Sequence, residues 1–195
     1  MRKRIVGFSV AFGVLALLIA GAAAMAQRAR QLAALEPSMR ILAAIEGDAW
    51  TRFIANLVLR HGPALDIGTR TLTDQSLLQF VLAGYEADGP AKNARVLKVA
   101  KFLVTQGIDP NTHGPLGLAA LHDAVLFDGP PVVTFLLDIG ADPDRRAGRG
   151  PYEGLTPTQL LERLRERDPG RPRRDVEVIL RKAVRAGGAH GDHGG

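Results

Sequence analysis

The sequence contains side chains that are able to do acid–base chemistry, but their spacing does not by itself form a catalytic centre. His122 and Asp123 are adjacent, but neighbours on a helix point about 100° apart and so do not form a hydrogen-bonded dyad. Asp109 and Asp142 occupy equivalent places in two similar segments, where a carboxylate is able to accept hydrogen bonds from the backbone of its own turn. We therefore expect structural roles for these acids.

Motifs with a known catalytic mechanism are missing. The sequence has no G-x-S-x-G, H-E-x-x-H or P-loop pattern, and it has no cysteine, which excludes thiol nucleophiles, disulfides and cysteine-ligated metals. The C-terminal stretch from Ala189 to Gly195 contains two histidines and one aspartate. The glycines around them provide no groups to orient metal ligands, so a flexible tail over residues 190–195 is predicted instead. We expect no enzymatic activity, no metal and no cofactor.

Two segments with the same residue order indicate an internal repeat. Residues 106–111 read QGIDPN and residues 139–144 read IGADPD, so that Gly107 and Gly140 are 33 residues apart. Each segment follows an apolar pattern of helical period. Glycine closes a helix in the left-handed conformation, and the Asp-Pro pair then forces an extended exit. The pattern predicts a repeating unit of helix, turn and helix.

A repeat of this length and ending resembles the ankyrin repeat. Residues 117–124, GLAALHDA, match the Gly, Leu, His and Ala positions of the family's first-helix signature, and residues 154–161 keep its Thr-Pro pair at Thr156 and Pro157. The resemblance implies an all-α solenoid of about four helix–turn–helix units over residues 37–189, preceded by an N-terminal hydrophobic segment. It also implies that His122 is a structural residue that hydrogen-bonds backbone in the turn below.

The units at either end follow the family pattern less closely. A helix over residues 48–61 is predicted to present one apolar face, made of Trp50, Phe53, Ile54, Leu57 and Val58. The next unit carries about 12 residues beyond the family period, which we place in residues 84–90, between its two helices. In the last unit, residues 165–174 are predicted to form a loop before a closing helix over residues 175–185. Leu121, Ala124, Leu136 and Leu137 are expected in the core.

The N-terminus is predicted to interact with a membrane. Arg2, Lys3 and Arg4 precede an uncharged apolar run over residues 5–26. About 20 apolar residues are able to span a bilayer, whereas the small residues ending at Ala26 fit cleavage by signal peptidase, and both alternatives stay open. Residues 1–26 are thus a signal peptide or a transmembrane anchor. Since positive charge before the run stays in the cytoplasm, we expect a periplasmic protein, or one in the inner membrane facing the periplasm.

Charge is unevenly distributed over the rest of the chain. Residues 27–144 contain 10 basic and 13 acidic side chains, whereas residues 145–195 contain 12 basic and 7 acidic ones. A polar cap on the last unit of a solenoid explains this basic end most simply; recognition of an acidic partner is the alternative. Apart from Tyr152, the basic end lacks aromatic side chains on which bases stack, so nucleic acid is not an expected partner.

Stacked helix pairs leave protruding loops and a concave surface for binding other proteins. The loop over residues 145–153 is about four residues longer than the family pattern and contains arginine and tyrosine, which are enriched at interfaces. The predicted partner-binding residues are Arg145, Arg146, Arg149 and Tyr152 in this loop, with Asn111, His113 and Leu116, of which His113 is expected to be exposed, in the preceding one.

Together these observations predict a protein of the bacterial envelope that binds another protein. Its partner would be a protein with an acidic surface, and an immunity protein that blocks a periplasmic toxin is one specific form. The membrane would be a second partner if the N-terminal segment is not cleaved. Two alternatives stay open: an envelope metal-dependent hydrolase using His113, His122 and the tail histidines, and a structural tether without a dedicated ligand.

Overall fold

The fold is given by a computed structural model, which describes residues 2–64, 66, 68, 70–71, 74–86, 89–171 and 173–188, with side chains from Leu18 onward. In this part of the chain the regular elements are helices, besides one isolated bridge between Arg70 and Ser76. The predicted all-α class is confirmed. The chain divides into two compact units, Met1–Ala64 and Leu65–Gly195. The predicted domain over residues 37–189 includes parts of both units, and the predicted tail lies outside the described residues.

The first unit contains one long helix and one helix pair. Its three helices are α1 (Arg2–Ala33), α2 (Pro37–Glu46) and α3 (Ala49–His61). Asp48 caps α3 by accepting a hydrogen bond from the backbone N–H of Thr51 at 2.8 Å. The Arg28 guanidinium donates to the Thr51 hydroxyl at 3.4 Å, which attaches α1 to the start of α3. The helix α1 passes residue 26 without a break.

Among the residues whose side chains are described, no helix combines the length and the apolar character needed to cross a membrane. Residues 1–17 of the predicted signal or anchor lie outside that description. The membrane-directed role of residues 1–26 therefore stays a prediction.

The apolar face predicted for α3 is only partly buried. Ile54 and Val58 are buried, whereas Trp50, Phe53 and Leu57 are 53%, 52% and 37% exposed. The Trp50 and Phe53 rings stack with their centroids 6.0 Å apart. A helix buries only the part of its apolar stripe that faces a neighbour, and α3 packs against α1 and α2.

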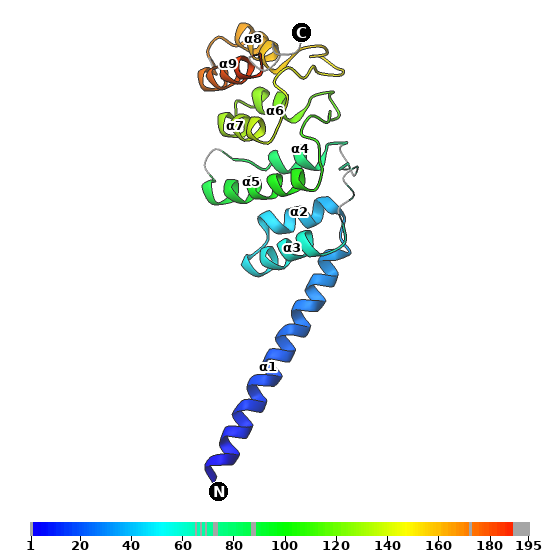
Figure 1. Ribbon diagram of the computed structural model, residues 1–195, viewed down its shortest axis with the longest axis vertical. Helices are drawn as coiled ribbons and strands as arrows, with labels where there is room; N and C mark the ends of the chain where they lie inside the picture. The colour runs from blue at the N-terminus through cyan, green and yellow to red at the C-terminus, as the bar shows by residue number, and fades with distance from the viewer. Residues whose placement is uncertain are drawn as a thin grey trace. The chain divides into compact units, whose positions relative to one another are not determined.

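The second unit consists of three helix pairs in successive layers (Figure 1). The first helices of adjacent layers contact one another, α4 with α6 and α6 with α8, and α7 contacts α9. Leu121, Leu136 and Leu160 are buried between them. With the pair α2–α3, the described residues contain four helix pairs, as predicted for an ankyrin-type solenoid. The helices of this unit are α4 (Leu77–Leu82), α5 (Pro90–Thr105), α6 (Ala120–Leu126), α7 (Pro130–Asp138), α8 (Pro157–Arg167) and α9 (Arg174–Gly188).

The residues that begin and end these helices act as predicted. Gly107 and Gly140 follow α5 and α7 with φ of 96° and 93°, in the left-handed region that glycine favours. Thr156 caps α8 in a reciprocal pair with Gln159, and Pro157 takes the first helical position, where its missing N–H removes no helical bond.

Two predicted boundaries were displaced. The extra residues of the second repeat are only partly in the loop after α4, because α5 itself has 16 residues whereas its counterpart α7 has 9. The loop predicted at residues 165–174 is shorter, since α8 continues to Arg167 and α9 begins at Arg174. Leu137 is half-buried, unlike Leu136, because a helix nine residues long covers the core with one face only.

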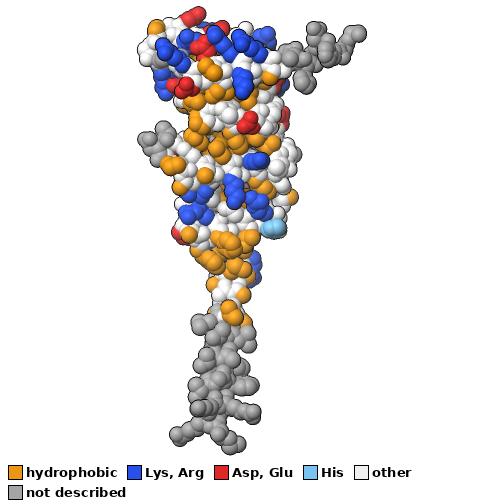
Figure 2. Space-filling view, turned by 60° about the vertical axis from the view of Figure 1, so that its left-hand side comes forward, with side chains coloured by type: hydrophobic (Ala, Val, Ile, Leu, Met, Phe, Trp, Pro, Cys, Tyr) orange, Lys and Arg blue, Asp and Glu red, His pale blue; other side chains and the backbone are white. Residues whose placement is uncertain are grey.

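The basic end of the chain forms the last layer of the second unit. Figure 2 shows Lys and Arg side chains, with acidic ones among them, on the layer of the second unit that α8 and α9 form. Glu177 forms ion pairs with Arg165 at 2.7 Å and with Arg181 at 2.6 Å. Part of the positive charge is thus paired within the layer, as in a polar cap.

Candidate partner-binding surfaces

Corresponding side chains at the start of α4 and α6 link successive repeats. Gln79 is the third residue after the cap Ser76, and His122 is the third residue after Ala119, which precedes α6. Gln79 Nε2 donates to the Leu118 carbonyl at 2.9 Å, and His122 Nε2 lies 3.0 Å from the Leu155 carbonyl. Each accepting carbonyl belongs to the residue just before the N-cap of the next first helix, Ala119 for α6 and Thr156 for α8. The two bonds fix the spacing between neighbouring first helices.

His122 is the structural residue that the family resemblance implied. Its side chain is buried, and burial, the largest effect, lowers the pKa of the imidazole below its usual value. The hydrogen bond to a carbonyl requires a proton on Nε2, so the neutral tautomer leaves Nδ1 as an acceptor. Nδ1 is buried without a hydrogen-bond partner among the described residues. A protonated His122 would therefore add an uncompensated charge to the core.

Asp123 faces a different environment from its neighbour. Its carboxylate Oδ2 accepts a hydrogen bond from Gln79 Nε2 at 2.8 Å. Burial raises the pKa of this carboxyl to about 6, and the Gln79 bond opposes the shift without cancelling it. The same Gln79 nitrogen donates to the Leu118 carbonyl, so both hydrogens of its amide are used.

The Gln79 amide is held rigidly by its surroundings. Its Oε1 accepts from the backbone N–H of Ser76 at 3.2 Å, and its backbone N–H donates to the Ser76 hydroxyl at the same distance. A side chain at Gly114 would place a Cβ only 2.7 Å from the Gln79 amide. Glycine at this position allows the loop before α6 to lie directly against Gln79.

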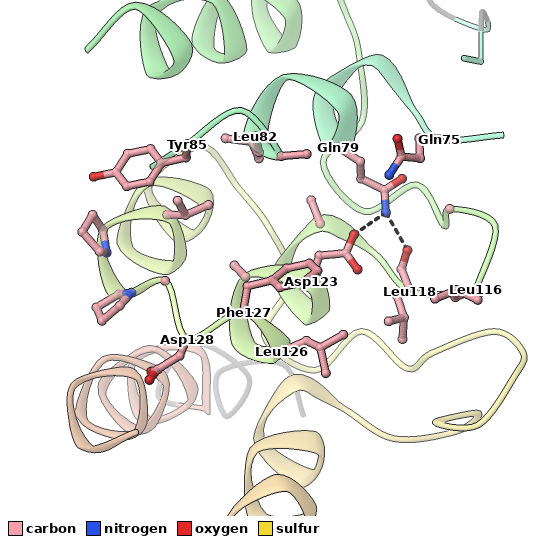
Figure 3. Close-up of a pocket in the computed structure, with 18 of the residues that line it drawn as sticks. Gln75, Gln79, Leu82, Tyr85, Leu116, Leu118, Asp123, Leu126, Phe127 and Asp128 are labelled. Atoms are coloured by element: carbon pink, nitrogen blue, oxygen red, sulfur yellow. Dashed lines mark hydrogen bonds between the residues drawn. The ribbon is translucent and has the colours of Figure 1, made fainter. Parts of the chain in front are cut away.

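Gln79 and Asp123 line an open groove of about 640 Å³ between α4 and α6 (Figure 3). We call this hollow the groove. Phe127 and Leu116 line it although their side chains are 74% and 55% exposed. Figure 3 shows the Gln79 and Asp123 side chains pointing toward each other, with Tyr85 and Phe127 on one side and Leu116 on the other. The remaining apolar lining includes Leu82, Leu118, Ala124 and Leu126.

The predicted binding residues lie in two adjoining loops, residues 109–117 and 142–155, which we call the loop surface. Gly148 N–H donates to the Gly117 carbonyl at 2.8 Å, and within the longer loop Gly154 N–H donates to the Ala147 carbonyl at 2.8 Å. Gly117 has φ of 72°, and a Cβ there would lie 2.4 Å from the backbone nitrogen of Arg149. The enlarged loop is therefore packed closely against the preceding one.

Several of the predicted side chains already make contacts within the loop surface. The Asn111 amide donates to the Gly140 carbonyl at 3.3 Å and accepts from Asp142 N–H at 2.8 Å. His113 was expected to be exposed but is half-buried, and its Nε2 lies 2.9 Å from the Arg146 carbonyl. That expectation was wrong because the next repeat's loop covers one side of the ring.

The basic side chains of the longer loop differ in their surroundings. Arg146 donates to the Gly154 carbonyl at 2.8 Å. Arg149 lies 3.4 Å from Asp74, with its side chain 62% exposed. Arg145 is exposed and Tyr152 is half-buried. A role in partner binding stays a prediction for all four residues.

The structure thus brings the predicted residues together, but it adds a second surface. Leu116 belongs to both the loop surface and the groove. Gln79, Asp123 and Phe127 were not identified as binding residues from the sequence. A signal for Asp123 was present: if His122 turns into the core, the side chain about 100° further round the helix must face another way.

Within the part of the chain that the structure describes, no three His, Asp or Glu side chains are grouped as metal ligands. The histidines of the tail, His190 and His193, lie outside this part of the chain.

Comparison with protein families gives one match. Residues 116–147 match the family described as the ankyrin repeat. The matched segment contains α6, α7 and the Gly140 turn that ends α7. A comparison with curated proteins finds no match.

Proposed function

We propose that this ankyrin-repeat protein binds a partner protein in the bacterial envelope. Ankyrin repeats form protein-interaction modules, and the surface that binds here consists of the groove and the adjoining loop surface. The observation that carries this proposal is the pair of exposed apolar side chains on the groove, Phe127 and Leu116. Large apolar residues left in water beside a concave, partly apolar hollow mark a surface that a partner covers.

Export to the envelope is supported by the order of charges at the N-terminus. Three basic residues precede the apolar run over residues 5–26, and such an order directs the rest of the chain across the membrane. The protein is then periplasmic after cleavage, or held in the inner membrane and facing the periplasm. A reporter that is active only in the cytoplasm, fused after Gly195, will be silent; an active reporter would contradict this orientation. N-terminal sequencing that begins at Gln27 would identify cleavage.

The specific form of the proposal is an immunity protein that inhibits a toxic enzyme of the periplasm. A rigid stack of helices is suited to this task, since a preorganised surface loses little conformational entropy on binding. Expression of the chain in sensitive cells will protect them from the enzyme it inhibits. A screen of envelope toxins in which the intact, exported chain protects against none would contradict the immunity role, while leaving protein binding open to the test below.

Binding through the groove is tested by crosslinking and capture from envelope extract. The double change Leu116→Ala, Phe127→Ala removes exposed apolar area and leaves the helices intact, so the captured partner will decrease about tenfold or more. Val178→Ala is the matched control, because Val178 is 66% exposed on α9, away from the groove lining. Equal capture by the double variant and the wild type would contradict binding at the groove.

A further inference from the structure

The groove is acidic although the chain is basic. The chain has a net charge of +5, but the ionisable side chains that line the groove are Asp123, Asp128 and Tyr85, without a lysine, arginine or histidine among the described lining residues. Asp128 already has a cationic partner, because Arg171 lies 3.1 Å from its carboxylate. Asp123 is the carboxylate of the groove that has no cationic partner in the described part of the chain.

The lack of a cationic partner matters because of where the Asp123 carboxylate lies. Its carboxylate receives a hydrogen bond from Gln79, whereas an ionised carboxylate has about four acceptor sites. Both amide hydrogens of Gln79 are used and its position is fixed, so the protein itself has no further hydrogen to offer from that side chain. A cation entering the groove would stabilise the ionised form that burial disfavours.

The apolar lining restricts what kind of cation fits. Phe127 is 74% exposed and Leu116 55% exposed, and Figure 3 places them on different sides of Asp123. A small inorganic cation would leave both side chains in water. A chain with apolar groups on either side of one long basic side chain would cover them and also reach the carboxylate. Lys and Arg suit this task, since their stems are apolar and only their ends are charged.

We propose that the groove binds an apolar segment of a partner protein that carries a lysine or arginine, and that the cation of this residue is seated against the Asp123 carboxylate. The inference rests on the proposed function, because it names the chemistry of the partner segment at the same surface. It also separates the groove from the loop surface, whose arginines suit an acidic partner.

The probe for this inference is a library of displayed random peptides, panned on the full chain in detergent at about pH 7.5. Peptides that bind the wild type better than the Leu116→Ala, Phe127→Ala variant are sequenced. The inference expects one Lys or Arg between apolar residues to be enriched in this groove-dependent set. A groove-dependent set without a basic residue, or an empty set, overturns it.

Charge removal at Asp123 then tests the contact directly. Asp123→Asn keeps the size of the side chain and an oxygen for Gln79, and it removes a charge that burial disfavours, so the fold is expected to persist. Binding of a selected basic peptide will weaken about tenfold or more, as is typical when one member of a desolvated ion pair is lost. Asp138→Asn is the matched control, because it removes one carboxylate from an exposed position on α7 outside the groove lining; binding will stay within about twofold.

The pH dependence distinguishes a contact with the carboxylate from a change of shape. The affinity of the wild type for the basic peptide will fall as the pH decreases from about 7.5 to about 5, because Asp123 takes up a proton near its pKa of about 6. The other ionisable groups at the groove, Tyr85 and Asp128 with its partner Arg171, are unchanged in Asp123→Asn. This variant will therefore lack that part of the pH dependence. Equal pH profiles overturn the inference.

Failure of this inference and failure of the proposed function give different results. If all selected peptides lose binding in a variant with Arg145, Arg146 and Arg149 changed to alanine and none in Asp123→Asn, protein binding stands and the groove inference falls. If neither peptides nor an envelope protein bind the folded chain at all, both fall.

Discussion

The loop surface and the groove lie side by side in the same unit, yet their charged groups differ in exposure to water and in their partners. The arginines of the loop surface are exposed, and two of them already have a partner within the chain, Arg146 the Gly154 carbonyl and Arg149 the Asp74 carboxylate. Asp123 is withdrawn into an apolar hollow and has no cation beside it in the described residues. An exposed ion pair contributes about 0–1 kcal/mol, whereas a desolvated one determines whether a partner binds.

Residue type alone therefore does not identify a binding surface. Arginine and tyrosine are common at interfaces, which directs attention to residues 145–153. The fold already uses part of that loop to pack against residues 113–117, as the Gly148–Gly117 hydrogen bond shows. The groove contains few residues of the enriched types, but its exposed Phe127 and its half-buried Asp123 carboxylate leave more to be gained from a partner.

The largest effect is expected from a change in the core that supports both surfaces. Leu136 is fully buried on α7, so Leu136→Ala will lower the free energy of unfolding by about 2–5 kcal/mol through lost burial and a cavity. Chemical denaturation measures it. Partner binding and peptide binding will decrease together. A loss below about 0.5 kcal/mol, the size expected at the exposed surface, would contradict the packing of α7.

Gly117→Ala will damage the loop surface selectively. Gly117 has a positive φ, and a Cβ there would clash with the Arg149 backbone at 2.4 Å; we expect a loss of about 1–3 kcal/mol in the free energy of unfolding. Gly140→Ala is the matched control, because Gly140 also has a positive φ but open space around its Cβ position. Thermal or chemical unfolding of both variants isolates the contact between the loops. Equal losses would mean that this contact contributes nothing to stability.

The pH dependence of stability will distinguish the half-buried Asp123 carboxylate from the exposed charges. The pKa of Asp123 is raised from 3.8 to about 6, so the folded state binds more protons than the unfolded state between these values, and lowering the pH through this window stabilises the fold. As the pH is lowered through this window, the free energy of unfolding of the wild type will rise relative to that of Asp123→Asn by an amount on the order of 1 kcal/mol. His122 has the opposite sign, because its lowered pKa makes the fold lose stability as the pH falls below 6.5. His122 is present in both proteins, so the comparison by denaturation at several pH values isolates Asp123. A constant difference would contradict its burial.

The smallest effect on stability is expected at the loop arginines. The triple change Arg145→Ala, Arg146→Ala, Arg149→Ala will alter the free energy of unfolding by about 0.5 kcal/mol, since exposed charges contribute little. If the loop surface contacts an acidic partner, capture will decrease severalfold at low salt and less at high salt, and Tyr152→Ala will add a loss that does not depend on salt. Capture that is unchanged in the quadruple variant would remove the loop surface from the interface.

The sequence was sufficient where a local rule decides the structure. Gly107 and Gly140 end their helices, and Thr156 caps α8, because backbone conformation and capping depend on a few neighbouring residues. It was insufficient where a distant neighbour decides. Whether Trp50 is buried depends on what packs over α3, and whether His113 is exposed depends on a loop 33 residues further along the chain. The groove could not be predicted from local rules alone, since its carboxylate, Asp123, belongs to α6 and its fixed amide, Gln79, belongs to α4.

Partner binding at the groove is tested most directly by site-specific photo-crosslinking in living cells, with the crosslinker placed in turn at Phe127, at Arg149 and at Val178. Phe127 and Val178 are both highly exposed apolar positions, but only Phe127 lines the groove. We expect one crosslinked envelope protein at Phe127, which is lost when Asp123→Asn is added, and none at Val178. A partner crosslinked at Arg149 but never at Phe127 would contradict the central role of the groove.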